Sequence, residues 1–190
     1  MAVNSANARI FGSDNDAVWV APLGSELPTD LELPTDPFAD VGWLHTDGIT
    51  VGGDTTVERF RGHQGGKVIR TKVTESNTTF QFQCLETTAL TLGLQFNILE
   101  KTGTTDLTTA TISASRKVTP RTFVIDVFDI DDETNPYQYR WMFERGEIGE
   151  REEFTLINSD ITGYTFTVEV IDEFILLTND PAFADTTSGS

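Results

Sequence analysis

Several short segments alternate apolar and polar residues with a period of two, and this pattern constrains the fold more than any other feature. Tyr164, Phe166 and Val168 alternate with Thr and Glu, and residues 78–84 alternate in the same way. Because successive side chains of a strand point to opposite faces, each segment predicts a strand with one buried face. Further strands are expected at residues 17–21, 42–45, 49–51, 57–61, 67–73, 109–115, 121–130, 137–147 and 153–157. Many such strands separated by turns predict a mainly β fold, an antiparallel sandwich or barrel.

Two glycine-containing turns predict hairpins. Asp47-Gly48 separates residues 42–45 from residues 49–51, and Gly65-Gly66 separates residues 57–61 from residues 67–73. Both dipeptides suit the left-handed backbone of a tight hairpin turn. One short helix is expected at residues 86–96, where apolar residues recur at helical spacing. These residues are Leu85, Ala89, Leu92 and Phe96.

The first strand is followed by a segment that suits neither a sheet nor solvent. Residues 22–40 hold four of the seven prolines, which remove backbone donors and exclude a central strand. The same segment is rich in large apolar side chains, so it is expected to cover a surface, either of its own domain or of a neighbour. These side chains are Leu23, Leu27, Leu31, Leu33 and Phe38.

The segments give a simple domain organisation. Residues 1–16 are small and polar, which predicts a flexible N-terminal arm without a signal peptide. Residues 17–174 contain the predicted strands and form one domain. Residues 175–190 end in Thr, Ser and Gly and are expected to form a mobile tail.

The charge is strongly negative and uneven. A formal net charge of −17 argues against a protein that grips nucleic acid or an anionic membrane. The C-terminal part is acidic, which with a basic cluster suits head-to-tail contact between copies. The alternative is an acidic soluble domain whose basic hairpin forms ion pairs within the chain. The basic cluster holds five of the thirteen bases, Arg59, Arg61, Lys67, Arg70 and Lys72.

No pattern of catalytic, metal-ligating or cofactor-binding residues is present. His45 and His63 lie on different predicted turns, and Cys84 lies on the apolar face of its strand, where it is expected to be buried. Residues 62–68 resemble a phosphate loop but lack its spacing and its Ser or Thr. The acidic residues 129–133 lack the spacing of a calcium loop and are interpreted as a solvated turn. The sequence therefore predicts no enzyme, cofactor, metal or membrane span.

The order of motifs from residue 17 to residue 96 is more specific than any one of them. This ordered set resembles the major tail tube proteins of siphovirus-type bacteriophages, with long non-contractile tails, particularly those that infect actinobacteria. The set is Val18-Trp19-Val20-Ala21-Pro22-Leu23-Gly24-Ser25, Leu27-Pro28, Phe38, Val41-Gly42-Trp43-Leu44, Asp47-Gly48, Gln64-Gly65-Gly66 with Val68 and Arg70, and residues 80–87 leading into the helix.

The resemblance implies a two-sheet β-sandwich with a flanking helix. It also implies that six copies form a ring and that rings stack into a hollow tube around a tape-measure protein, capped by tail terminator and distal tail proteins. Such a tube assembles in the host cytoplasm, becomes part of the virion, and delivers DNA. A long loop would reach the neighbouring ring, and the matching segment here is residues 22–45. Its candidate contacts are Pro22, Leu23, Leu27, Leu31, Leu33, Phe38, Trp43 and Leu44.

The acidic balance adds a prediction about the lumen. Asp126, Glu144 and Glu169 each lie on the more polar side of their strands and are candidates for negative charge there. Like charges would let DNA pass without specific binding.

Two other classes of protein stay open. A tail terminator or head-tail joining protein would form one ring that does not stack. A sugar-binding adhesion module would expose an aromatic platform, for which Trp43 and Trp141 are the candidates.

Overall fold

The computed structural model describes residues 5–130 and 136–184. Parts of the predicted arm, of the turn at residues 129–133 and of the C-terminal tail fall outside these ranges. The elements are η1 (Ser5–Asn7), β1 (Ala17–Pro22), β2 (Ala39–Asp40), β3 (Leu44–Gly52), β4 (Thr55–Arg61), β5 (Val68–Ser76), β6 (Thr79–Cys84), α1 (Ala89–Gln95), β7 (Ile98–Gly103), β8 (Thr108–Ile112), β9 (Arg121–Phe128), β10 (Gln138–Arg151), β11 (Tyr164–Val170), β12 (Ile175–Thr178) and η2 (Pro181–Phe183).

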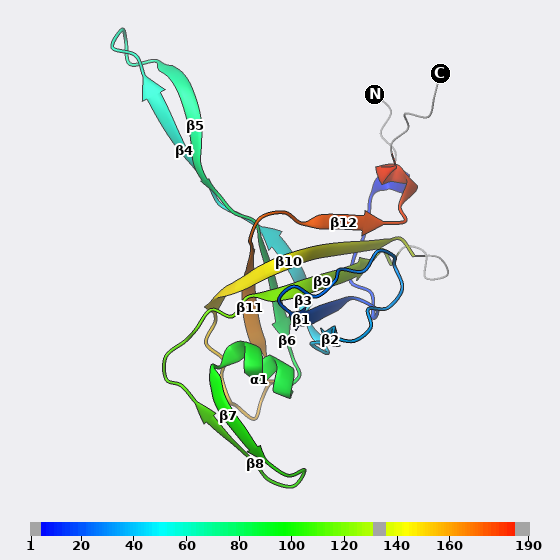
Figure 1. The fold of residues 1–190 in the computed structure, drawn as a ribbon. Helices are drawn as coiled ribbons and strands as arrows, with labels where there is room; N and C mark the ends of the chain where they lie inside the picture. Colours follow the sequence, from blue (N-terminus) through cyan, green and yellow to red (C-terminus); the bar gives the residue numbers. More distant parts are fainter. Residues whose placement is uncertain (1–4, 131–135, 185–190) are drawn as a thin grey trace.

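Eight strands form one antiparallel sheet in the order β2-β1-β9-β10-β11-β6-β3, with β12 also paired to β10. The long strand β10 belongs to two layers. Its first half pairs with β9 and β12, and its second half pairs with β11. Figure 1 shows that β9, β10 and β12 run across β11 and β6, so the sheet folds over on itself. The result is the expected mainly β, antiparallel sandwich with one helix.

Strand β10 changes layers where its pairing is irregular. Its register shifts between Phe143 and Gly146 against β9, and again between Ile148 and Glu150 against β11. Bulges of this kind bend a strand and let it turn a corner between packed layers. A Cβ atom on Gly146 would lie within 2.7 Å of side-chain atoms of Phe143, Phe123 and Val168. Glycine is therefore needed at this corner by close packing.

The core lies between the two layers and is built from the apolar faces that alternation predicted. On β6, Phe80 and Phe82 are buried, and on β11 the side chains from Tyr164 to Val170 alternate between buried and half-buried. Phe80 stacks on Phe143 of the facing layer at 5.4 Å between ring centroids. Phe143 in turn stacks on Phe123 at 5.3 Å. This aromatic column joins the two layers.

Two expected strand features are wrong. Residues 44–52 form the single strand β3, and Asp47-Gly48 lies in an irregular part of it instead of closing a hairpin. Gly48 does take the left-handed conformation, with φ +70°, but β3 continues past it along β6. Residues 153–157 form no strand and lie in the connection of residues 152–163 between β10 and β11. The expected hairpin around Gly65-Gly66 is confirmed.

The helix is shorter than expected and presents a different face. Thr88 is its N-cap, and its side chain and that of Thr91 bond reciprocally to each other's backbone N–H in a capping box. Glu86 therefore lies before the helix, and its carboxylate accepts the Trp43 N–H at 3.0 Å. Leu94 is buried, whereas Ala89, which was placed on the inner face, is exposed. The cap at Thr88 therefore starts the helix at Ala89, three residues later than expected.

Both ends of the described chain pack on the sheet. Residues 175–178 form β12 and pair with β10, so they belong to the domain instead of the predicted tail. In the arm, Arg9 lies 2.7 Å from the buried Asp180 and 3.5 Å from Asp129. The folded unit therefore extends beyond the expected limits of residues 17 and 174.

Candidate assembly surfaces

The β4–β5 hairpin projects far from the sheet at one end of the molecule (Figure 1). Its turn residues Gly65 and Gly66 have φ values of +72° and +62°, as a two-glycine hairpin turn requires. Every residue of β5 is exposed. At the base, the Asp54 N–H donates to Asn77 Oδ1 at 2.6 Å, and the Asn77 N–H donates to the Asp54 carbonyl at 3.1 Å. The hairpin is thus closed at its base by these two hydrogen bonds, and its β5 side chains are not buried against the body.

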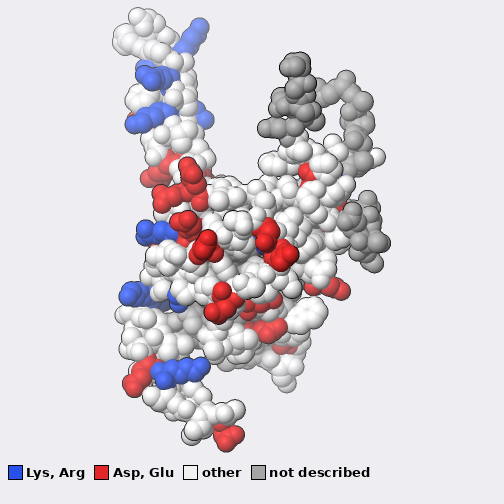
Figure 2. Space-filling view, turned by 45° about the vertical axis from the view of Figure 1, so that its right-hand side comes forward, with Lys and Arg blue, Asp and Glu red and all other residues white. Residues whose placement is uncertain are grey.

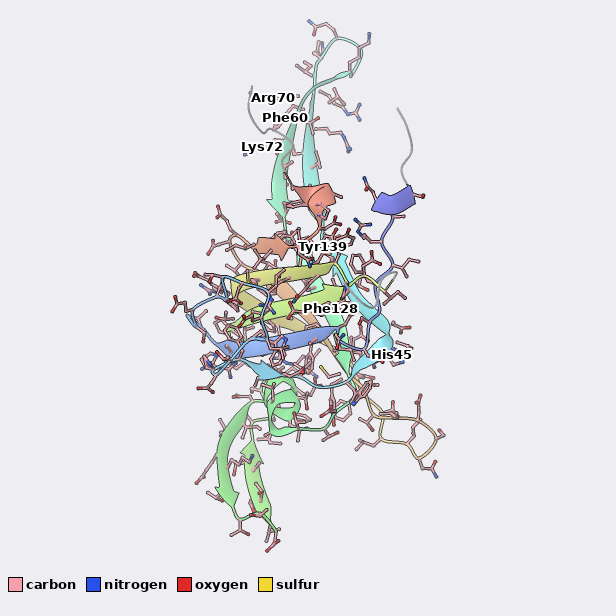
Figure 3. The ribbon with its side chains drawn as sticks, turned by 90° about the vertical axis from the view of Figure 1, so that its right-hand side faces the viewer. His45, Phe60, Arg70, Lys72, Phe128 and Tyr139 are labelled. Atoms are coloured by element: carbon pink, nitrogen blue, oxygen red, sulfur yellow. The ribbon has the colours of Figure 1, made fainter. Side chains whose placement is uncertain are left out.

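One face of this hairpin combines aromatic and basic side chains. Phe60 pairs with Arg70 across the strands, and Glu58 pairs with Lys72. Figure 3 shows Phe60, Arg70 and Lys72 along the hairpin, away from the body. Phe60 on this face is 46% exposed, whereas Ile69, which neighbours Arg70 in β5 and so points to the other face, is 73% exposed. The face is suited to contact with an acidic, partly apolar partner.

The charge of the hairpin is opposite to that of the rest of the molecule. Residues 55–76 hold five bases and two acids, a net charge of +3, whereas the other residues hold eight bases and twenty-eight acids, a net charge of −20. Figure 2 shows the basic side chains on the hairpin and acidic ones over the adjoining body. None of the ion pairs among the described residues involves a hairpin base. The described residues therefore do not support the alternative in which the basic hairpin forms ion pairs within the chain.

The opposite end of the body carries two other projections. The β7–β8 hairpin is exposed along nearly its whole length, and the connection of residues 152–163 between β10 and β11 lies at the same end (Figures 1 and 3). The connection exposes Leu156 by 77% and Ile161 by 68%. The two ends of the molecule therefore present unlike surfaces.

The proline-rich segment folds back on its own domain. It crosses the β1–β9–β10 layer, where Arg140 donates from Nη1 to the Asp30 carbonyl at 2.7 Å (Figures 1 and 3). Of its predicted contact residues, Leu27, Leu31, Phe38 and Leu44 are half-buried. Pro22, Leu23, Leu33 and Trp43 stay exposed. The segment thus covers its own domain, and its contact with a neighbouring ring stays a prediction.

Beneath this segment lies a buried ion pair that sequence patterns did not indicate. Arg140 has no exposed surface, and its Nε and Nη2 atoms donate to the two carboxylate oxygens of Asp126 at 2.7 and 2.8 Å. Gln138 donates to the same carboxylate at 3.1 Å. The ion pair is bidentate, and the third guanidinium nitrogen, Nη1, donates to the Asp30 carbonyl. Arg140 therefore holds the proline-rich segment against the sheet.

A family model described as phage tail tube protein matches residues 1–178. The chain belongs to the phage tail tube protein family. Among curated proteins, none matches this sequence. A solved chain from "Cryo-EM structure of the anti-feeding prophage (AFP) baseplate, 6-fold symmetrised" is similar with a TM-score of 0.41 and 10% identity, covering 93% of this chain and 97% of that chain. As a member of this structural family, the tail tube protein is a component of the phage tail and not an enzyme.

The expected lumen acids of the tail tube protein are separated by the fold. Asp126 is buried against Arg140, so its assignment to an exposed acidic surface is wrong. Its strand is covered on both faces, which the alternating pattern did not indicate. Glu144 is exposed on β10, and Glu169 is half-buried on β11, where it pairs with Glu147. Glu144 and Glu169 stay candidates for the lumen.

The residues considered for chemistry are dispersed. His45 lies on β3 at the side of the body (Figure 3), and His63 lies in the hairpin turn. Cys84 is buried as expected, and burial raises the pKa of its thiol to about 12. The described residues contain no group of His, Cys, Asp and Glu that could hold a metal ion. No helix within the described ranges is long and apolar enough to cross a membrane.

A cluster at the chain ends was also missed by sequence reasoning. The Arg9 guanidinium lies 4.5 Å from the centre of the Tyr137 ring and pairs with Asp180, which also accepts the Tyr139 hydroxyl. Burial opposes ionisation of Asp180, but the hydrogen bonds from Tyr139, the Ala182 N–H and Arg9 hold the pKa of its carboxyl below the usual range. Arg9 and Asp180 lie far in sequence from each other and from the two tyrosines, so only the fold brings the four residues together.

Proposed function

We propose that this tail tube protein forms rings of six copies that stack into a hollow tube through which DNA reaches the host. The observation that carries the proposal is the β4–β5 hairpin, which is basic, partly apolar and without packing on its own body. A long hairpin of this kind is stable in water only marginally, so its stabilising contacts are expected to come from a neighbouring copy.

The resemblance of residues 17–96 supports the finer assignment to a siphovirus-type phage with a long non-contractile tail, with an actinobacterial host. It supports a tape-measure protein inside the tube, tail terminator and distal tail proteins at its ends, and assembly in the host cytoplasm. The net charge of −17 supports passage of DNA without specific binding, because a surface of like charge repels it.

Assembly can be tested on the purified chain with a concentration series followed by light scattering and negative-stain electron microscopy. We expect long tubes above a critical concentration. Isolated rings that never stack would favour a terminator or joining protein instead. A stable monomer that binds glycans would favour an adhesion module.

Of the two tryptophans considered for glycan binding, only Trp43 is exposed. Trp141 is half-buried and packs against Phe80 and Phe174, with ring centroids 6.1 and 5.9 Å apart, so Trp43 is the more accessible of the two candidates. Trp43→Ala should therefore abolish any glycan binding that the monomer shows. If the protein forms tubes, we expect no detectable glycan binding by the unmodified chain and none by the Trp43→Ala variant.

A further inference from the structure

We infer that the connection of residues 152–163 is the surface that receives the β4–β5 hairpin of a second copy. This inference rests on the proposed assembly and adds the partner surface for the hairpin. The two surfaces lie at opposite ends of the body (Figures 1 and 3), which is the arrangement that an open head-to-tail stack requires.

The charges of the two surfaces are complementary. The hairpin has a net charge of +3, and residues 152–163 hold three acids and no base, a net charge of −3. Glu153 and Asp160 are exposed. Opposite potentials on two unlike surfaces steer association and oppose pairing of two like ends.

The apolar side chains of the two surfaces are also matched. Leu156, Ile157 and Ile161 are exposed by 77, 51 and 68%. The hairpin presents Phe60 with an exposure of 46% on the face of Arg70 and Lys72, and Ile69 and Val73 with exposures of 73 and 55% on its other face. Apolar clusters bordered by charges on both sides are typical of surfaces that become the centre of an interface.

The base of the connection is fixed, although its tip is exposed. The Phe154 ring packs on Tyr164 at 4.9 Å and on Phe96 at 6.1 Å between ring centroids. Arg151 donates from Nε to the Leu94 carbonyl at 2.7 Å, so the connection is also tied to the end of α1. A surface that is held at its base loses less conformational freedom when a partner binds.

The β7–β8 hairpin lies at the same end but fits the basic hairpin less well. Residues 98–112 hold Glu100, Lys101 and Asp106, a net charge of −1. The connection therefore offers the greater charge complementarity, and it also holds its apolar residues within one short loop.

The test is charge reversal on each surface, with tube formation as the readout. In Arg70→Glu/Lys72→Glu and in Glu153→Lys/Asp160→Lys, like charges would face each other, and we expect the critical concentration to rise at least about tenfold. The four substitutions combined restore opposite charges and should restore assembly. An equimolar mixture of the two double variants should also assemble, because each supplies the partner that the other needs.

Asp14→Lys/Glu173→Lys is the matched control, since it changes the net charge by the same amount on exposed residues outside both surfaces and outside residues 22–45. We expect it to assemble like the unmodified chain. Far-UV circular dichroism should show that all variants remain folded. Normal assembly of Glu153→Lys/Asp160→Lys, or no rescue in the combined variant, would overturn the inference and leave the proposed tube intact. An unmodified chain that never assembles would instead overturn both.

Discussion

Basic side chains lie in different environments in the body and in the β4–β5 hairpin. In the body, Arg140 is buried, pairs with Asp126 and fastens a crossing segment. In the hairpin, Arg70 and Lys72 are exposed and take part in none of the ion pairs among the described residues. The difference indicates that the body's charges serve the fold of one copy, whereas the hairpin's charges are available for contact between copies.

The sharpest way to test this division is to remove the buried charge. We expect Arg140→Met to lower the free energy of unfolding by about 3–5 kcal/mol, because it leaves Asp126 buried without a counter-charge. Guanidinium unfolding measures the change. Arg145→Met is the control, since the Arg145–Glu147 pair is largely exposed and should matter by less than about 1 kcal/mol. Arg140→Met/Asp126→Leu should recover most of the loss, and no recovery would contradict this account.

The corner of β10 is the next most sensitive position. Gly146→Ala should cost about 1–3 kcal/mol, because the new methyl group would press on Phe143, Phe123 and Val168. Gly149→Ala, three residues along the same strand, meets no atom within 4 Å and should change stability by less than about 0.5 kcal/mol. Equal effects in urea unfolding would show that close packing at the corner does not matter.

A smaller, pH-dependent effect is expected where the arm meets β9. The Asp16 carboxylate accepts the Phe128 N–H at 2.8 Å, and burial raises the pKa of Asp16 from 3.8 to about 6. The folded state therefore binds the proton more tightly than the unfolded state, and stability falls as the pH rises from about 4 to about 6.

Asp16→Asn keeps an acceptor for Phe128 but does not ionise. At pH 7 it should be more stable than the unmodified chain by on the order of 1 kcal/mol, because solvent screens part of the cost of the charge. At pH 4 the difference should largely vanish. Urea unfolding at both pH values measures it, and Asp14→Asn, at an exposed position, is the control variant.

The smallest effect on stability is expected from the largest change. Replacing residues 55–76 with a two-residue Asn-Gly turn between Asp54 and Asn77 should alter the unfolding free energy by less than about 0.5 kcal/mol. The same deletion should abolish tubes in electron micrographs. A strongly destabilised variant would show that the hairpin supports the body, and tubes formed without the hairpin would contradict its role in assembly.

Alternation revealed strands that have one buried face, because the pattern records burial directly. Phe80, Phe82 and Cys84 of β6 were correctly placed in the core. Alternation does not describe β10, where the successive residues Met142 and Phe143 are both buried, as is Arg140. Nothing in a strand's own sequence shows that a distant loop covers its second face.

The turn residues likewise predicted only the conformation of their own backbone. Gly65-Gly66 closes a hairpin and Gly48 has the expected left-handed backbone, yet β3 continues past it because β6 offers a partner on both sides of the irregularity. For the candidate surfaces, the basic cluster was visible in the sequence, whereas its lack of partners required the fold. Leu156 and Ile157 were expected in a strand, and only the structure shows them exposed.

The closure of the hairpin at Asp54 and Asn77 has a consequence for how such a chain can change over generations. Gly53 has no room for a Cβ atom against the Asn77 carbonyl, so the residues at the base of the hairpin are constrained by packing. The exposed strands beyond this base are not constrained in this way. On the proposed assembly, substitutions in the hairpin would change which copies recognise one another while the core stays intact. Divergence in this one segment would then give a tube that excludes the subunits of a co-infecting relative.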